Sequence, residues 1–342
     1  MAEEKRDVTI EVLQSEYLNK EELQAPPVEL SRIESHNIRI YYGYNNGIIE
    51  FFPGVTGFLS KVLPTPKELI DWKVMMGKDA DAYVKERACY GSIMHGQFVP
   101  LLVDNKYELD STYDIINQAC RIARIQVDEV NWSRELKKDI LAFAQWMHDY
   151  KVIPLAIEVP LITRKYGIAT LVDLVCKMTI PTKGFWGEEY KTGVRKGEPK
   201  ETKEDCEVYA VIDFKSRKKP YVTRADQLQL AYGVEMVKEN YPELKDKEFR
   251  MFSWHPKDWK TAPGSHFTEH TAKHSIRELE LYSELYYLTN DVYRYSRMSF
   301  QGTVEVGGDL TDNYTTRSLS EIIDLRAIEE AKLIKKEENE TN

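Results

Sequence analysis

The hydrophobic positions repeat with one period in the first half of the chain and with another in the middle. From about residue 79 to residue 150, apolar residues recur every three to four positions, the spacing of one helix face. From Leu155 onward the period is two, which is typical of strands. The pattern predicts, in chain order, helices over 79–102, 111–126 and 132–150, strands over 155–162, 168–178 and 211–215, a helix over 223–239, a strand over 249–254 and a helix over 273–298. This mixture predicts an α/β fold: a small mixed sheet with antiparallel central strands, flanked by helices.

Outside this core, the pattern suggests how the rest of the chain is organised. Alternating runs at 38–42 and 48–52 flank Asn46-Gly47, the strongest short signal for a hairpin. The expected organisation is a polar, loosely attached extension over 1–35, one domain over 36–300 with a surface insertion over 180–206, and a C-terminal loop and helix over 301–342 with a frayed tail. The C-terminal helix is predicted from the capping box Ser318-Leu319-Ser320-Glu321.

The composition is that of a globular protein with a sizeable core, since 42% of the residues are hydrophobic and 11% aromatic. The formal net charge of −9 argues against a general basic coat, although a local basic groove can still bind nucleic acid. No apolar run approaches the ~20 residues of a membrane span, and residues 1–20 lack the apolar centre of a signal peptide. The four cysteines contain no CxxC pair. We therefore expect a cytoplasmic protein with reduced thiols and no membrane partner.

Asp213 and Lys215 place an acid and an amine on one face of the strand over 211–215, because side chains two apart share a face. Ile212 and Phe214 point the other way, into a core. A half-buried acid and amine each need a partner. A divalent metal could serve the acid and a phosphate the lysine. The other interpretation is an edge-strand ion pair on a solvated face.

Glu158 and Asp173 lie on the two strands that flank the turn over 163–167. If these strands pair about Lys165 and Tyr166, the two carboxylates stand opposite each other, roughly 5 Å apart at Cβ. Like charges side by side repel, and a cation is the usual remedy. Alternatively, Glu158 pairs with a lysine or arginine of a helix and only Asp173 faces a site.

Gly91 and His95 lie one turn apart on the same face of the helix over 79–102. The glycine permits close approach of another backbone beside the histidine, although a single histidine on a helix can equally be a core or surface residue. His266, His270 and His274 are spaced four apart, as zinc ligands on one helix can be. They straddle a predicted strand-to-helix transition, which disfavours a zinc site.

Several of these features occur in the order found in a known enzyme family. They are the Gly91-x-x-x-His95 motif, Glu158, Asp173, the triplet Asp213-Phe214-Lys215 and a helix with glutamine and tyrosine. This series resembles the PD-(D/E)XK nuclease superfamily in its RecB-like exonuclease branch. With Pro53-Gly54-Val55-Thr56 and Leu69-Ile70-Asp71-Trp72, it looks most like the mitochondrial genome maintenance exonucleases and their phage and bacterial relatives. The likeness covers about residues 38 to 300.

The resemblance implies a restriction-endonuclease-like core that uses Mg²⁺ or Mn²⁺. The implied metal ligands are His95, Asp173, Asp213 and the carbonyl of Phe214, the implied catalytic residues are Lys215, Asp213, Asp173 and Glu158, and the implied nucleic-acid contacts are Gln227, Tyr232, Arg217, Lys218 and Arg224. The family's glutamine and tyrosine are usually four apart, whereas Gln227 and Gln229 lie five and three residues before Tyr232. Which glutamine faces the site stays open. No iron–sulfur cluster is expected, because no cysteine follows Cys206.

The same resemblance implies a DNA exonuclease of recombination, replication or repair, in a bacterial or phage-infected cell. Its partners would be DNA ends or single strands, and a recombination or single-strand-binding protein. One alternative is a structure-specific or restriction-type endonuclease. Another is a nuclease-derived subunit that binds DNA without cutting it.

Overall fold

The structure is a computed structural model. It describes residues 9–26, 28–35, 38–45, 48–189, 191–194, 196, 199–270, 276–289, 296–300 and 314–318. Among them, no helix is both long and apolar enough to cross a membrane.

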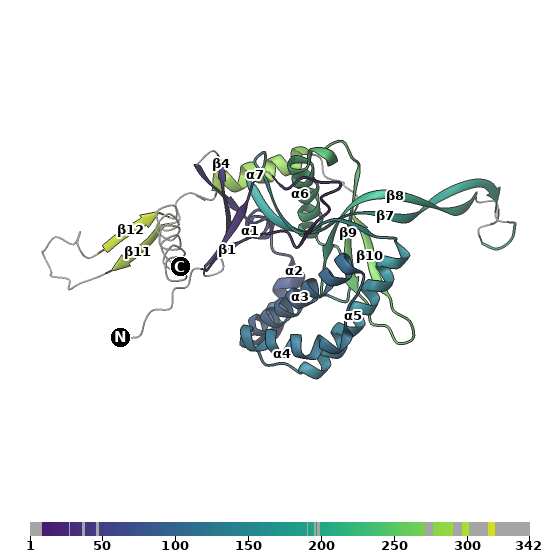
Figure 1. The fold of residues 1–342 in the computed structure, drawn as a ribbon, viewed down its shortest axis with the longest axis horizontal. Helices are drawn as coiled ribbons and strands as arrows, with labels where there is room; N and C mark the ends of the chain where they lie inside the picture. The colour runs from purple at the N-terminus through teal and green to yellow at the C-terminus, as the bar shows by residue number, and fades with distance from the viewer. Residues whose placement is uncertain are drawn as a thin grey trace, which may run out of the picture.

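The centre of the molecule is a six-stranded sheet (Figure 1). From edge to edge its strands are β10 (Ser265–His270), β9 (Phe249–Pro256), β8 (Pro199–Phe214), β7 (Ile168–Glu189), β6 (Ile153–Thr163) and β2 (Tyr17–Leu18). All neighbouring strands are antiparallel except β8 and β9, which are parallel. The expected α/β class and the mixed sheet with antiparallel central strands are therefore confirmed.

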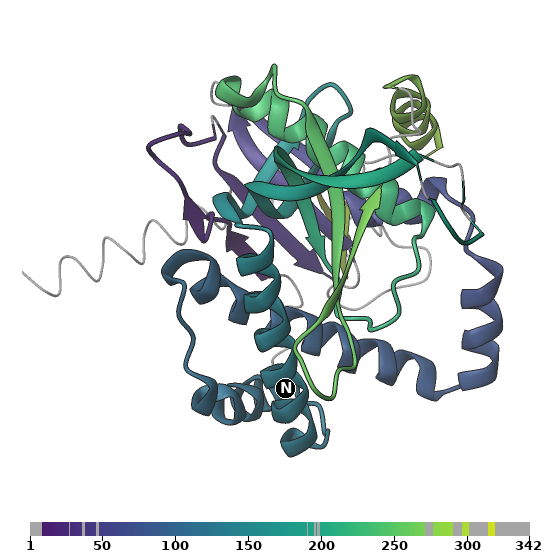
Figure 2. The same ribbon diagram turned by 90° about the vertical axis from the view of Figure 1, so that its right-hand side faces the viewer.

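Helices cover both faces of this sheet (Figure 1; Figure 2). The described helices are α1 (Val55–Val62), α2 (Lys67–Met76), α3 (Asp79–Asp104), α4 (Thr112–Ala123), α5 (Glu129–Asp149), α6 (Arg224–Asn240) and α7 (Ile276–Thr289), with short 3-10 helices at Leu109–Ser111 and Pro242–Leu244. On one face, α3, α4 and α5 form a core around Phe98, Phe143 and Phe214. On the other face, α1, α6 and α7 pack around Phe58 and Tyr232. Because both faces of the sheet are covered, polar side chains of its strands can reach an open site only where strands end or separate.

The segment before residue 36 is part of the fold, so the expectation of a loosely attached extension was wrong from residue 9 onward. β1 (Thr9–Val12) and β3 (Leu30–Ser35) join β4 (Ile38–Asn45) and β5 (Ile48–Pro53) in an antiparallel sheet of order β1-β3-β4-β5. Leu23 and Leu30 are buried, and Tyr17 pairs with Ile157 of the central sheet. Burial of these apolar side chains attaches the segment to the rest of the fold. The polar composition of the segment does not show this attachment. The β4–β5 hairpin is confirmed, whereas its Asn46-Gly47 turn lies outside the described residues.

The predicted surface insertion over 180–206 consists largely of strand. β7 and β8 stay paired from Leu174–Ile212 to Phe185–Glu201, well beyond the ends of β6 and β9, and form the long arm seen in Figure 1. The arm is a two-stranded extension of the central sheet, because the ladder of backbone hydrogen bonds continues outward without a break in register.

The predicted helix over 273–298 is shorter than expected. It is α7, which ends at Thr289, and residues 296–300 form β11 (Ser296–Phe300), paired with β12 (Tyr314–Ser318). Ser296 to Phe300 has the sequence Ser-Arg-Met-Ser-Phe, a composition that suits either element, so pairing with β12 decides it. The helix predicted after Ser318 falls on residues 319–342, which lie outside the described residues.

Candidate active site

The site forms where β7 and β8 separate. Their ladder ends at the pair Leu174–Ile212, and beyond it the carboxylate of Asp173 takes the place of a backbone partner. Its Oδ2 accepts a hydrogen bond from the backbone N–H of Phe214 at 2.6 Å. The side chain of Asp173 therefore holds the end of β8 and places the residues after Ile212 beside it.

Glu158 lies opposite Asp173, as expected, because the flanking pairs are Ile157–Leu174 and Val159–Val172. The backbone of Glu158 has φ 46°, in the left-handed region that non-glycine residues rarely adopt. The two strands change faces here: Ile157 and Leu174 pack in the core beside α5, whereas Val159 and Val172 pack in the core beside α6. This change turns the intervening carboxylates away from both cores. Backbone strain of this kind is typical of functional positions.

His95 of α3 completes a cluster with these two acids. One ligand atom from each of His95, Glu158 and Asp173 lies within 4.8 Å of the others. The Nδ1 atom of His95 is 3.2 Å from Oε1 of Glu158 and 3.9 Å from Oδ2 of Asp173. Its Nε2 atom lies 2.9 Å from the carbonyl oxygen of Phe214. Both ring nitrogens face acceptors, which is the arrangement of a protonated imidazolium. The helix residue that pairs with Glu158 is therefore this histidine, and not the lysine or arginine considered as an alternative.

The pKa values of the cluster agree with that geometry. Burial alone would lower the pKa of His95, but Asp173, Glu158 and Asp213 outweigh it and raise the pKa to about 9. Burial raises the pKa of Asp173 to about 7, Glu158 and Asp213 add to the rise, and His95 opposes it. Neighbouring acids that share one titratable counter-charge form a site that favours an added cation.

Asp213 and Lys215 form a second cluster next to the first. The Nζ atom of Lys215 lies 2.8 Å from Oδ2 of Asp213 and 3.2 Å from Oδ1 of Asp226, the third residue of α6. Burial alone would lower the pKa of Lys215, but Asp213 and Asp226 raise it above its ordinary value. The ion pair considered as an alternative does exist. It is not on a solvated edge, because β8 is a central strand and Asp213 is buried.

Gln229 connects the members of this second cluster. Its Nε2 atom donates to Oδ1 of Asp213 at 2.9 Å, and its Oε1 atom accepts from Lys215 at 3.4 Å. Gln229, not Gln227, therefore faces the site, which answers the question that the spacing left open. Gln227 accepts from Arg224 at 3.4 Å on another side of the helix.

The predicted nucleic-acid contacts are placed less favourably. Tyr232 is fully buried and donates to the carbonyl of Leu279, so it cannot touch a nucleic acid in this structure, and that expectation was wrong. Tyr232 packs instead against Phe58 and Tyr166 in the core. The three basic side chains each hold an acidic partner: Arg217 with Asp226, Lys218 with Glu135 and Asp258, and Arg224 with Glu278.

The close approach expected at Gly91 involves the loop that follows Lys215. A Cβ atom built on Gly91 would lie 3.4 Å from Oγ of Ser216, and Arg87, one turn earlier, donates to the Ser216 carbonyl at 3.0 Å. α3 therefore contributes His95 to the first cluster and holds the loop beyond the second. A larger side chain at position 91 would press on this loop.

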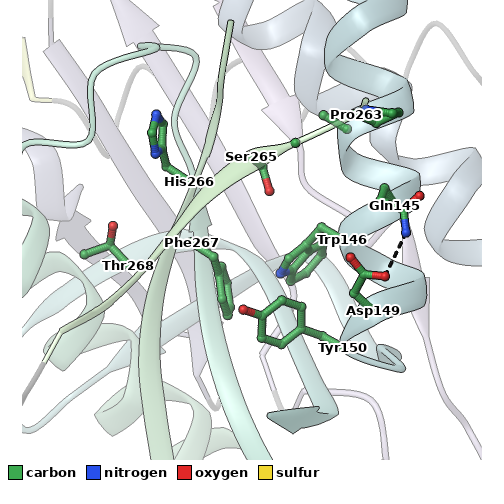
Figure 3. Close-up of a pocket in the computed structure, with 11 residues that line it drawn as sticks. Gln145, Trp146, Asp149, Tyr150, Pro263, Ser265, His266, Phe267 and Thr268 are labelled. Atoms are coloured by element: carbon green, nitrogen blue, oxygen red, sulfur yellow. Dashed lines mark hydrogen bonds between the residues drawn. The ribbon is translucent and has the colours of Figure 1, made fainter. Parts of the chain in front are cut away.

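The first cluster opens onto a cleft of about 910 Å³. His95, Glu158, Asp173 and Gln229 line one part of it, and the first turn of α1 and Arg32 and Arg39 of the N-terminal sheet line another. A second cavity, of about 470 Å³, lies between the end of α5 and β10 (Figure 3). Its lining includes Trp146, Tyr150, Phe267 and His266, the last considered above as a zinc ligand, but none of the residues that the family resemblance implies. His95, Glu158 and Asp173, which the resemblance does imply, line the larger cleft. His266 and His270 lie on β10, and His274 is outside the described residues.

The sequence pattern did not indicate Asp226 as a site residue and left Gln229 as one of two candidates. Asp226 is buried between Lys215 and Arg217, and Gln229 lies one turn later on α6. The available signal was their spacing of three, which puts both on one helix face.

No protein-family model matches the sequence, and no curated protein matches it either.

Proposed function

We propose that this protein is a metal-dependent nuclease that hydrolyses phosphodiester bonds in DNA. The observation that carries the proposal is the half-buried Lys215 beside a group of His95, Glu158 and Asp173 that opens onto a cleft. Hydrolysis of a phosphodiester needs an activated water, compensation of negative charge on the phosphoryl oxygens and help for the leaving oxygen. The carboxylates that line the cleft, together with the amine of Lys215 held by Asp213 next to them, supply the residue types for these tasks.

The donor set fits Mg²⁺ or Mn²⁺, because carboxylate and carbonyl oxygens are the ligands that these cations prefer. Asp173 and Glu158 would hold the ion, with Asp213, the Phe214 carbonyl and a deprotonated His95 as further ligands. A bound ion supplies charge neutralisation and a more acidic water. No iron–sulfur cluster is part of the proposal.

The chain's own residues have separate tasks in this proposal. Lys215 would contact a phosphoryl oxygen and compensate its charge in the transition state. Gln229 would keep Asp213 and Lys215 in register with each other through the two hydrogen bonds described above. Without a metal ion, the protonated His95 would compensate the negative charges of Glu158 and Asp173. A bound metal ion would take over that compensation.

We further propose exonuclease activity on DNA ends or single strands, in recombination, replication or repair in the cytoplasm of a bacterial or phage-infected cell. This part rests on the resemblance in motif order, as does a recombination or single-strand-binding protein as partner. A structure-specific endonuclease and a non-cleaving DNA-binding subunit are the competing functions.

The test is digestion of one plasmid in circular and linear form, with Mg²⁺ or with EDTA. Loss of the linear form alone, dependent on Mg²⁺, is the expected result. Nicking of the circular form would favour the endonuclease, and a gel shift without cleavage would favour the binding subunit. Lys215→Ala should abolish cleavage, whereas Lys245→Ala, an exposed lysine beyond α6, should not. Full activity of wild type in EDTA, or of Lys215→Ala, would refute the assignment.

A further inference from the structure

Asp226 is a buried carboxylate whose two oxygens have different partners. It is 5% exposed and lies in the first turn of α6. Its Oδ2 atom accepts from the Thr223 hydroxyl at 2.6 Å and pairs with Nη2 of Arg217 at 2.6 Å. Its Oδ1 atom is 3.2 Å from Nζ of Lys215. One oxygen thus serves the helix cap and Arg217, and the other is directed at the lysine.

A helix cap alone does not explain this arrangement. The capping box needs one acceptor at this position, which Oδ2 already provides by accepting from the Thr223 backbone at 3.1 Å. Burying a carboxylate is costly unless fixed cations compensate it. Burial would raise the pKa of Asp226, but Lys215, Thr223 and Arg217 outweigh it and lower the pKa to about 2. The carboxylate is therefore held in its charged form beside the lysine.

The second partner of Lys215 cannot hold it in all states of the site. The Oδ1 atom of Asp213 accepts from Gln229, and its Oδ2 atom pairs with Lys215 at 2.8 Å. If Asp213 binds a metal ion through Oδ2, that oxygen is shared between two cations, which weakens its hold on the ammonium group. Asp226 lies on α6 and is not among the metal ligands proposed above, so its Oδ1 atom stays available to Lys215.

We propose that Asp226 is the positioning residue of Lys215: it keeps the ammonium group beside the scissile phosphate when Asp213 is engaged elsewhere. This inference rests on the proposed nuclease function. Arg217 has a supporting task, because it compensates the second oxygen of Asp226 and so leaves the first for Lys215. Asp226 and Arg217 would act on the substrate only through Lys215.

The first experiment compares Asp226→Asn, Asp226→Glu and Thr223→Ala in Mg²⁺-dependent DNA cleavage. Asp226→Asn should lower kcat roughly 10- to 100-fold, with KM for DNA and the Mg²⁺ affinity little changed. Asp226→Glu, which keeps the charge, should restore part of kcat. Thr223→Ala removes the cap of the same helix and one donor to Oδ2 of Asp226, but leaves Oδ1 facing Lys215 and Arg217 on Oδ2, so it should lower Tm while keeping kcat. If kcat follows Tm across the three variants, Asp226 is only a helix cap and the proposal is wrong.

The second experiment does not depend on cleavage. Each protein, with Mg²⁺ present, is treated briefly with an amine-acetylating reagent, and modification of Lys215 is measured by mass spectrometry against the exposed Lys245. Asp226→Asn should raise the Lys215 ratio several-fold, and Thr223→Ala should not. An unchanged ratio in Asp226→Asn would overturn the inference. A raised ratio in a protein whose wild type cuts no DNA would refute the nuclease function and leave the placement of Lys215 by Asp226 standing.

Discussion

The cluster of His95, Glu158 and Asp173 and the cluster of Asp213, Lys215 and Asp226 each gather two carboxylates, yet their counter-charges differ in kind. In the second cluster, the acids raise the pKa of Lys215 above its ordinary value, and Arg217 pairs with Asp226 beside it. In the first, the only close cation among the described residues is a histidine, which can lose its proton. A divalent cation can replace that proton but has nothing to replace in the second cluster. This contrast supports the proposal that a metal ion would bind at the first cluster, with Asp213 as a further ligand, while the second cluster keeps a fixed positive charge.

The largest expected effect breaks the first cluster without touching the second. Asp173→Asn should lower Mg²⁺-dependent cleavage by roughly a thousandfold, because it removes a charge that would hold the cation. In EDTA the same variant should be at least as stable as wild type, since it removes one of two adjacent acids, while the amide oxygen can still accept from Phe214. Cleavage rates and melting curves check both statements. The exposed Asp246→Asn is the matched control, and cleavage by Asp173→Asn at the control's rate would contradict the comparison.

The next effect is metal-dependent stability. A cation that binds only the folded protein stabilises it by about 2.7 kcal/mol at a concentration roughly 100 times its Kd. Melting with Mg²⁺, Mn²⁺ or EDTA should therefore show a rise in Tm for wild type and for Lys215→Ala, and little rise for Asp173→Asn. A similar rise in all three proteins would mean that the ion binds elsewhere.

The metal-free protein should lose stability as pH rises from about 6.5 to 9. In the folded state, the pKa of His95 is raised from 6.5 to about 9, so its contribution is full below the lower value and is lost as pH passes the higher one. Asp173, raised from 3.8 to about 7, acts in the same direction at lower pH. His95→Gln should flatten the pH dependence of Tm in EDTA over this window. His148→Gln, an exposed histidine at the end of α5, should leave it unchanged. An identical slope in both variants would disprove the role of His95.

The smallest effect concerns the backbone of Glu158. Asparagine tolerates the left-handed region better than glutamine does, and both remove the charge. Glu158→Asn should therefore be more stable than Glu158→Gln by roughly 1 kcal/mol in chemical denaturation. Equal stability of the two variants would show that the φ of 46° carries no strain.

The sequence predicts the first cluster better than the second for a physical reason. Glu158 and Asp173 face each other across one short hairpin, so a local turn fixes their pairing. The direction of Gln229 depends on the rotation of α6 against the sheet, which spacing to Tyr232 does not determine. Asp226 has the pattern of an ordinary capping residue, and only the fold brings Lys215 to it.

Contacts between distant segments also explain the other differences. Within residues 9–35, β3 is defined by pairing with β4, whereas β2 is defined by pairing with β6. The polar strands of the arm pair with each other, so neither needs the alternating apolar pattern by which a strand is usually detected. His95 reaches its acid from 63 residues away, a separation for which no local rule exists.

The arm formed by β7 and β8 has a consequence for how this chain can vary in length. Its register runs unshifted from Leu174–Ile212 to Phe185–Glu201, so removing equal numbers of residues from the two strands would leave Asp173 and Asp213 in the same relation. A deletion of one residue from a single strand would exchange its two faces beyond the deletion, because the base of the arm stays paired with β6 and β9. Within the unshifted part, viable insertions and deletions should therefore be symmetric; the register shift of the described ladder lies beyond it, between Phe185 and Glu189. A tag or a second domain grafted beyond the pair Phe185–Glu201 should leave the positions of Asp173 and Asp213 unchanged.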